Sequence, residues 1–135
     1  MTGSGTEWSH RAAFEASPVS ASHARAFVAE RLREHGLADL VEPVRLVTSE
    51  LATNAMVHAH TAFDLTLERL DGIVRLTIRD DSLSLPQRRA AQVRDSTGRG
   101  LEIVDVVSSE WGTSQDRAGS KAVWATFVVR ESRQF

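Results

Sequence analysis

The residues best suited to chemistry lie on one predicted helix, Val44–His60, with the sequence VRLVTSELATNAMVHAH. Glu50, Asn54 and His58 follow one another at a spacing of four, which places them on the same side of a helix. A carboxylate can accept a proton or orient a nucleophile, and an amide oxygen one turn away can ligate a hard cation. The pattern predicts either a ligand or cation site or a structural hydrogen-bond network.

The rest of this helix determines how unusual those three positions are. Pro43 suits a first helical turn, and no glycine or proline interrupts the segment that follows. At 100° per residue, the apolar arc contains Val44, Leu46, Val47, Leu51, Ala55 and Val57, and the opposite arc contains Arg45, Thr48, Ser49, Ala52, Thr53 and Met56. Glu50 and Asn54 fall inside the apolar arc, where an acid and an amide are costly unless something pairs with them.

A second candidate acid follows a predicted hairpin. Phe63–Leu70 and Ile73–Asp80 alternate between apolar and polar residues, and Asp71-Gly72 between them is typical of a two-residue hairpin turn. Asp80 has the same parity as the apolar residues of its strand. It therefore emerges either on an apolar face at the end of that strand, or after the strand has ended, as the start of a turn.

A glycine pair opens the next predicted helix, from Gly98-Arg99-Gly100 to about Ser109, with Leu101 on its buried side. Glycines let a ligand approach the backbone closely, and the first N–H groups of a helix favour an anion such as phosphate. The pattern alone is weak, since many helices begin after glycine. The preceding segment, residues 81–97, is long for a connection and is either a lid or a solvated surface. Its three basic residues, which could meet phosphates, are Arg88, Arg89 and Arg94.

The remaining segments set the fold class. We expect a strand within Glu7–Ala16, a helix over Pro18–Glu34 that Gly36 ends, and two closing strands, Glu110–Ser114 and Lys121–Arg130. This order predicts an α/β two-layer sandwich, with a mixed, mostly antiparallel sheet and the helices on one face. Residues 1–6 are expected to form a disordered tail and residues 7–130 a single domain.

Composition narrows the function classes. The 135 residues are 41% hydrophobic and 25% charged with a net charge of −2, which is typical of a globular protein. Basic residues are scattered, so no nucleic-acid footprint is expected. The absence of cysteine excludes disulfides and thiolate metal sites. We expect no membrane segment, no secretory signal and a cytoplasmic location.

Taken together, several segments resemble the GHKL ATPases. SELATNAMVHA resembles their N-box, IRDDS their adenine-recognition box, GRGLEIVDVVSSEWG the glycine box after the ATP lid, and GSKAVWATFVV the closing strand. Their order and spacing are similar to the anti-sigma-factor serine/threonine kinase branch of actinobacterial type. The resemblance runs from about Phe14 to Val129.

The resemblance implies the Bergerat fold, with ATP and Mg²⁺ as cofactors. Asn54 would ligate Mg²⁺, Glu50 would be the general base, and Asp80 would accept a hydrogen bond from the adenine amino group. The phosphate side would be lined by Gly98, Arg99, Gly100 and Leu101. The phosphoacceptor would be an anti-anti-sigma protein, and a homodimer of the chain would also hold a sigma factor.

Departures from the family pattern leave an alternative open. Many members carry D-x-G-x-G after the adenine acid, but this chain has Asp80-Asp81-Ser82-Leu83-Ser84, and Ala122 stands where relatives often have threonine. Retention of both Glu50 and Asn54 favours a kinase, whereas the loss of both glycines favours a non-catalytic nucleotide-binding or sequestering module. A histidine kinase catalytic domain is disfavoured, because no region bearing a phosphoacceptor histidine precedes the domain.

Overall fold

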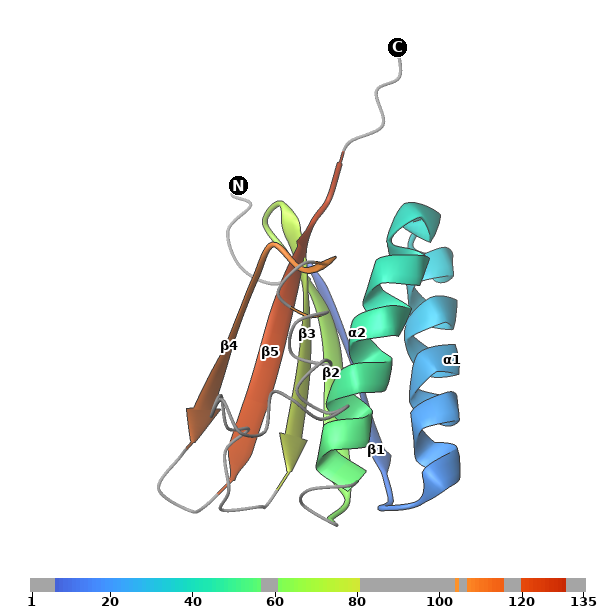
Figure 1. Ribbon diagram of the computed structural model, residues 1–135. Helices are drawn as coiled ribbons and strands as arrows, with labels where there is room; N and C mark the ends of the chain where they lie inside the picture. Colours follow the sequence, from blue (N-terminus) through green and yellow to red (C-terminus); the bar gives the residue numbers. More distant parts are fainter. Residues whose placement is uncertain (1–6, 57–60, 81–103, 105–106, 116–119, 131–135) are drawn as a thin grey trace.

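In the part of the chain that the structure describes, one antiparallel sheet is covered on one face by the two long helices α1 and α2 (Figure 1). The computed structural model describes residues 7–56, 61–80, 104, 107–115 and 120–130. The elements, in chain order, are β1 Trp8–Phe14, α1 Pro18–Glu34, the short 3₁₀ helix η1 Ala38–Leu40, α2 Val41–Asn54, β2 Phe63–Leu70, β3 Ile73–Asp80, β4 Glu110–Gln115 and β5 Lys121–Val128. The predicted α/β two-layer sandwich is confirmed.

Among the described residues, the sheet has five strands in the order β1-β2-β3-β5-β4, and every neighbouring pair is antiparallel. Alternation in the sequence explains its inner face. The buried side chains of the three central strands are Phe63, Leu65, Leu67, Val74, Leu76, Ile78, Val123, Ala125 and Phe127. The turn between β2 and β3 is the predicted one, with Gly72 at a φ of +78° that a residue with a Cβ rarely adopts.

Helix α1 has the predicted ends. Pro18 lies at its start, and Gly36 follows its last turn with a φ of +74°. The apolar residues Val19, Ala26, Phe27 and Leu32 predict a buried stripe, but Val19 is 51% exposed and Ala26 is also exposed. The buried face consists of Ser20, Ala21, Ala24, Val28, Ala29 and Leu32. These mostly small side chains leave room for α2 to pack closely against α1.

Helix α2 begins at Val41, earlier than predicted, and Ala55 and Met56 continue it in a wider turn. The buried side of α2 is centred on other residues than the predicted apolar arc. Thr48 and Ala52 are fully buried, whereas Leu46 is 42% exposed. Thr48 is tolerated in the core because its hydroxyl donates to the carbonyl of Val44 at 2.7 Å. The buried face therefore turns away from Glu50 and Asn54, which lie on the flank of the helix.

The C-terminal end of α2, the end of β3 and the start of β5 lie at the same end of the molecule, the lower end in Figure 1. In the β3–β5 ladder, Asp80 pairs with Lys121. In the β2–β3 ladder, the same Asp80 pairs with Phe63. The β2–β3 hairpin and the closing strand β5 thus bring Asp80, Lys121 and the ring of Phe63 together on the face that the helices cover.

Candidate functional site

The predicted acid and amide of α2 have no polar partner among the residues that the structure describes. Glu50 and Asn54 are both half-buried. Within the part of the chain that the structure describes, no hydrogen bond or ion pair involves either side chain. A structural hydrogen-bond network would have used these groups. Their availability instead favours a ligand or cation site.

The position of this pair on the helix also suits a cation. Asn54 is the last residue of the regular α-helical part of α2, one turn after Glu50, so the two side chains lie on the same side of the helix. Mg²⁺ is commonly held by one or two protein oxygens together with substrate phosphates and waters. An unpartnered amide oxygen at Asn54 fits that requirement. No group of three or more potential metal-ligating side chains occurs among the described residues, so a site built wholly from protein ligands has no support there.

Asp80 lies on the buried face of β3, as its parity indicated. The strand continues through this residue, so the alternative of an early turn is wrong. The Asp80 side chain is only 3% exposed, and Lys121 Nζ approaches its Oδ2 atom at 3.6 Å with 5% of the lysine side chain exposed. Two opposite charges taken out of water at the end of a sheet need each other, because either one alone would be costly.

The sequence interpretation missed Lys121. It was assigned to the closing strand as an ordinary first residue, a position where lysine usually faces solvent. Two signals could have identified it. Lys121 is the only lysine in the sequence, and it has the same parity as the buried Val123, Ala125 and Phe127 of its strand.

The predicted phosphate-binding residues, Gly98, Arg99, Gly100 and Leu101, lie outside the described residues. So do His58 and the lid arginines Arg88, Arg89 and Arg94. Val104 of the same segment is described and fully buried, in contact with the main core.

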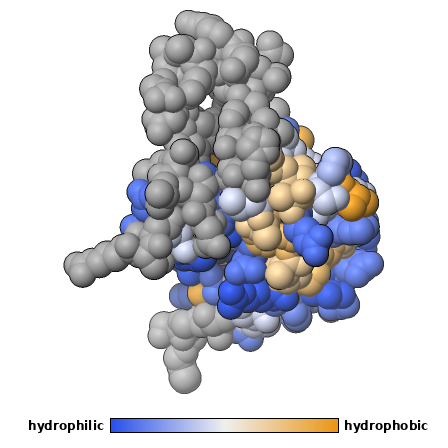
Figure 2. Space-filling model, turned by 90° about the horizontal axis from the view of Figure 1, so that it is seen from below, coloured by the Kyte–Doolittle hydropathy of each residue, from blue (hydrophilic) through white to orange (hydrophobic). Residues whose placement is uncertain are grey.

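Two cavities bounded by described residues lie elsewhere. One, of about 500 Å³, includes Arg69, Arg130 and Asp39 in its lining. The other, of about 440 Å³, includes Leu46 and Val107. Neither lining contains Glu50, Asn54 or Asp80. Figure 2, which views the lower end of the molecule, shows apolar surface bordered by polar and charged residues.

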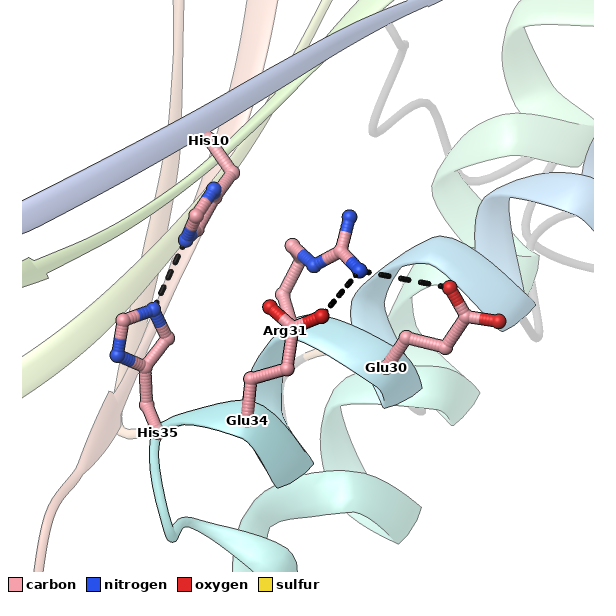
Figure 3. A network of polar contacts seen from close by, with 5 residues as sticks. All are labelled: His10, Glu30, Arg31, Glu34 and His35. Atoms are coloured by element: carbon pink, nitrogen blue, oxygen red, sulfur yellow. Dashed lines mark hydrogen bonds and ion pairs between the residues drawn. The ribbon is translucent and has the colours of Figure 1, made fainter.

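At the opposite end of the sheet, β1 and the end of α1 hold a second polar group (Figure 3). The Nε2 atoms of His10 and His35 are 2.8 Å apart, so one ring donates a hydrogen bond to the other. Trp8 stacks on His35 with ring centroids 4.0 Å apart. Burial, followed by the charges of His35 and Arg31, lowers the pKa of His10, and Glu34 opposes this effect.

No described helix is both long and apolar enough to cross a membrane. No curated protein matches the chain. A solved structure, that of the RsbU and RsbW domains of Rv1364c from Mycobacterium tuberculosis, matches with a TM-score of 0.66 and 22% sequence identity. The alignment covers 93% of this chain and 34% of that one, so this chain spans about a third of that protein. At this identity the likeness shows the fold.

The family model described as a histidine kinase-like ATPase domain matches residues 14–127. The match includes α2 with Glu50 and Asn54, and both strands of the Asp80–Lys121 pair. It covers most of the chain and agrees with the antiparallel sheet and its one-sided helical layer. The protein therefore belongs to the histidine kinase-like (GHKL-type) ATPase domain family.

Proposed function

We propose that the protein is an ATP-dependent serine/threonine protein kinase of the anti-sigma-factor type. It would transfer the γ-phosphoryl group of ATP to a hydroxyl of an anti-anti-sigma protein, and as a homodimer it would also sequester a sigma factor. The observation that carries the proposal is the half-buried pair Glu50 and Asn54, which have no polar partner among the described residues. The family match supports nucleotide binding by the same helix.

Each candidate residue has a distinct task in this proposal. Asn54 would present its amide oxygen to Mg²⁺ beside the phosphates, and Asp80 would accept a hydrogen bond from the adenine amino group. Gly98, Arg99, Gly100 and Leu101 would line the phosphate side. When bound, Mg²⁺ would supply positive charge that neutralises the charge on the phosphoryl group during transfer.

Glu50 would act as the general base. The acceptor hydroxyl oxygen forms a bond to the γ-phosphorus while the bond from that phosphorus to the bridging oxygen of ADP breaks. The hydroxyl proton passes to a carboxylate oxygen of Glu50. A half-buried carboxylate that no hydrogen bond or ion pair from the described residues engages is suited to this role, because it can turn toward an incoming hydroxyl.

The test is calorimetric titration with Mg·ATP, followed by incubation with γ-labelled ATP and candidate anti-anti-sigma proteins. We expect saturable binding and transfer of label to serine or threonine of one of those proteins. An absence of Mg·ATP binding to the folded protein would refute the proposal.

A second candidate function is a nucleotide-binding or sequestering module without transfer activity. The observation in its favour is the sequence Asp80-Asp81-Ser82-Leu83-Ser84, which lacks both glycines of D-x-G-x-G. The same experiment separates the two functions. Binding without transfer to any candidate partner, together with retention of a sigma factor, would support the module.

A further inference from the structure

In the buried ion pair of Asp80 and Lys121, the lysine ammonium group has hydrogen-bond donors that the carboxylate does not use. Lys121 Nζ lies 3.6 Å from Asp80 Oδ2, which is beyond hydrogen-bond range. An ammonium group has three N–H donors and no acceptor. Its side chain is 95% buried, and no hydrogen bond to a described residue accounts for these donors. The carboxylate satisfies the charge of the lysine but does not use its donors at this distance.

The choice of lysine at this position is specific. The sequence has 16 basic residues of the lysine and arginine types, and Lys121 is the only lysine among them. Arginine is a planar fork of fixed donors, whereas lysine concentrates three rotatable donors on one compact atom. A single ammonium can therefore face a carboxylate and, at the same time, donate to a neighbouring acceptor.

The pair also matches the edge of a purine. On adenine, the amino group is a donor, and the ring nitrogens beside it are acceptors. A carboxylate beside an ammonium presents the complementary acceptor and donor. The two opposite charges sum to zero, which suits an uncharged base better than a buried carboxylate alone would.

We propose that Lys121 is a second base-reading residue, which donates a hydrogen bond to a ring nitrogen beside the adenine amino group that Asp80 accepts. The proposal rests on the function proposed above and adds a residue that sets base specificity. The competing interpretation is that Lys121 only compensates the charge of Asp80 and never contacts the nucleotide.

Nucleotide analogues distinguish the two interpretations. We would measure, by calorimetry, the binding of ATP, 1-deaza-ATP and 7-deaza-ATP to the wild-type protein and to Lys121→Met. 1-deaza-ATP lacks N1 and 7-deaza-ATP lacks N7, the two ring nitrogens on either side of the amino group. We expect the wild type to bind one of the two about tenfold or more weakly than ATP, because a hydrogen bond from a charged donor is lost. In Lys121→Met that difference should vanish.

Arg79→Met is the matched control. Arg79 is the neighbour of Asp80 on β3, but it is exposed on the opposite face of the sheet. Its replacement removes the same charge without touching the pair, so the discrimination between ATP and the analogues should persist. Equal binding of all three nucleotides by the wild type, or discrimination that survives in Lys121→Met, would overturn the proposal.

Lys121→Met removes the ion-pair partner of the buried Asp80 and can destabilise the fold, so the wild type supplies a second measurement. With ¹⁵N-lysine labelling, the sole lysine gives a single side-chain resonance. We expect ATP to shift this signal and slow its hydrogen exchange. The deaza analogue that binds more weakly should do neither. The same response to all three nucleotides would overturn the proposal.

These outcomes are separable from failure of the proposed function. A folded wild-type protein that binds no Mg·ATP would refute nucleotide binding itself. A wild type that binds ATP and both analogues equally well would refute only the role of Lys121.

Discussion

Polar side chains pair with one another at the end of the sheet where β1 begins, whereas the acid and the amide at the end of α2 do not pair with any described residue. His10, His35, Arg31 and Glu34 form hydrogen bonds and ion pairs among themselves (Figure 3). Glu50 and Asn54 have no such partner among the described residues. The first group is a self-contained structural contact between β1 and α1. The second is a pair of half-buried polar groups whose hydrogen-bonding capacity no described residue uses.

The cost of leaving polar groups unpaired explains why this contrast is informative. A half-buried carboxylate or amide without a partner forgoes about 1 kcal/mol that a hydrogen bond would contribute. The same fold pairs its polar groups elsewhere, as Arg11 does with Asp64 at 2.8 Å and Arg75 with Glu68 at 2.9 Å. The absence of a described partner for both Glu50 and Asn54, one turn apart on α2, is therefore the feature on which the proposed binding site rests.

The largest expected effect is a loss of Mg·ATP affinity on changing the amide at the end of α2. Replacing Asn54 with alanine removes the proposed Mg²⁺ ligand, so we expect Mg·ATP affinity to fall by about 100-fold or more. The melting temperature should change little, because no hydrogen bond to the described residues is lost. Thr53→Ala, at the half-buried neighbouring position, is the control. Unchanged Mg·ATP affinity in Asn54→Ala, measured by calorimetry, would show that the site is misassigned.

Glu50→Gln should separate binding from chemistry. The amide keeps the size of the side chain but cannot take a proton, so we expect Mg·ATP affinity within about threefold of the wild type. Phosphoryl transfer to the acceptor protein should fall by roughly 10² to 10⁴. A rapid-quench assay with labelled ATP measures the transfer rate. Full activity in this variant would exclude Glu50 as the base.

Changes to the residues that contact one another where β1 begins should lower the stability of the fold and leave nucleotide binding unchanged. Trp8 stacks on His35 with an interplanar angle of 7° and contacts the hydrophobic core. We expect Trp8→Ala to lower the free energy of unfolding by about 2 kcal/mol, measured by urea titration. A large loss of ATP affinity in the folded variant would contradict the separation of the two ends.

The smallest expected effect is a dependence of stability on pH. The folded protein lowers the pKa of His10 from its ordinary value of 6.5, mainly through burial and then through His35 and Arg31. The unfolded chain therefore binds a proton at His10 more readily than the folded protein does. The stability contributed by neutral His10 is present above pH 6.5 and is lost as the pH falls below that value.

Urea midpoints at about pH 7.5 and about pH 5.5 test this expectation. His10→Gln should lose less stability on acidification than the wild type does, because the group that titrates is gone. Identical losses in the two proteins would show that His10 is not responsible.

Local patterns predicted most of the framework. The ends of α1 follow from Pro18 and Gly36, and the β2–β3 hairpin follows from strict alternation around Asp71-Gly72. The order and antiparallel pairing of the strands agree with the expected layer. The segment from Gly98 to Leu101 lies outside the described residues, so its predicted role remains a prediction.

The errors on α2 have a physical cause. A helical wheel ranks residues by hydropathy, so it placed Leu46 inside and Thr48 outside. In the fold, small residues of α1 face α2, and Thr48 enters the core by bonding its hydroxyl to Val44. Glu50 and Asn54 were correctly placed on one side of the helix by their spacing. Hydropathy alone could not show that this side is a flank accessible to a ligand.

The solitary lysine has a practical consequence. Every other basic side chain of the protein is an arginine or a histidine, and the one ε-amino group is enclosed at the end of the sheet. Reagents that acylate amines should therefore modify this side chain slowly in the folded protein and much faster once the sheet unfolds.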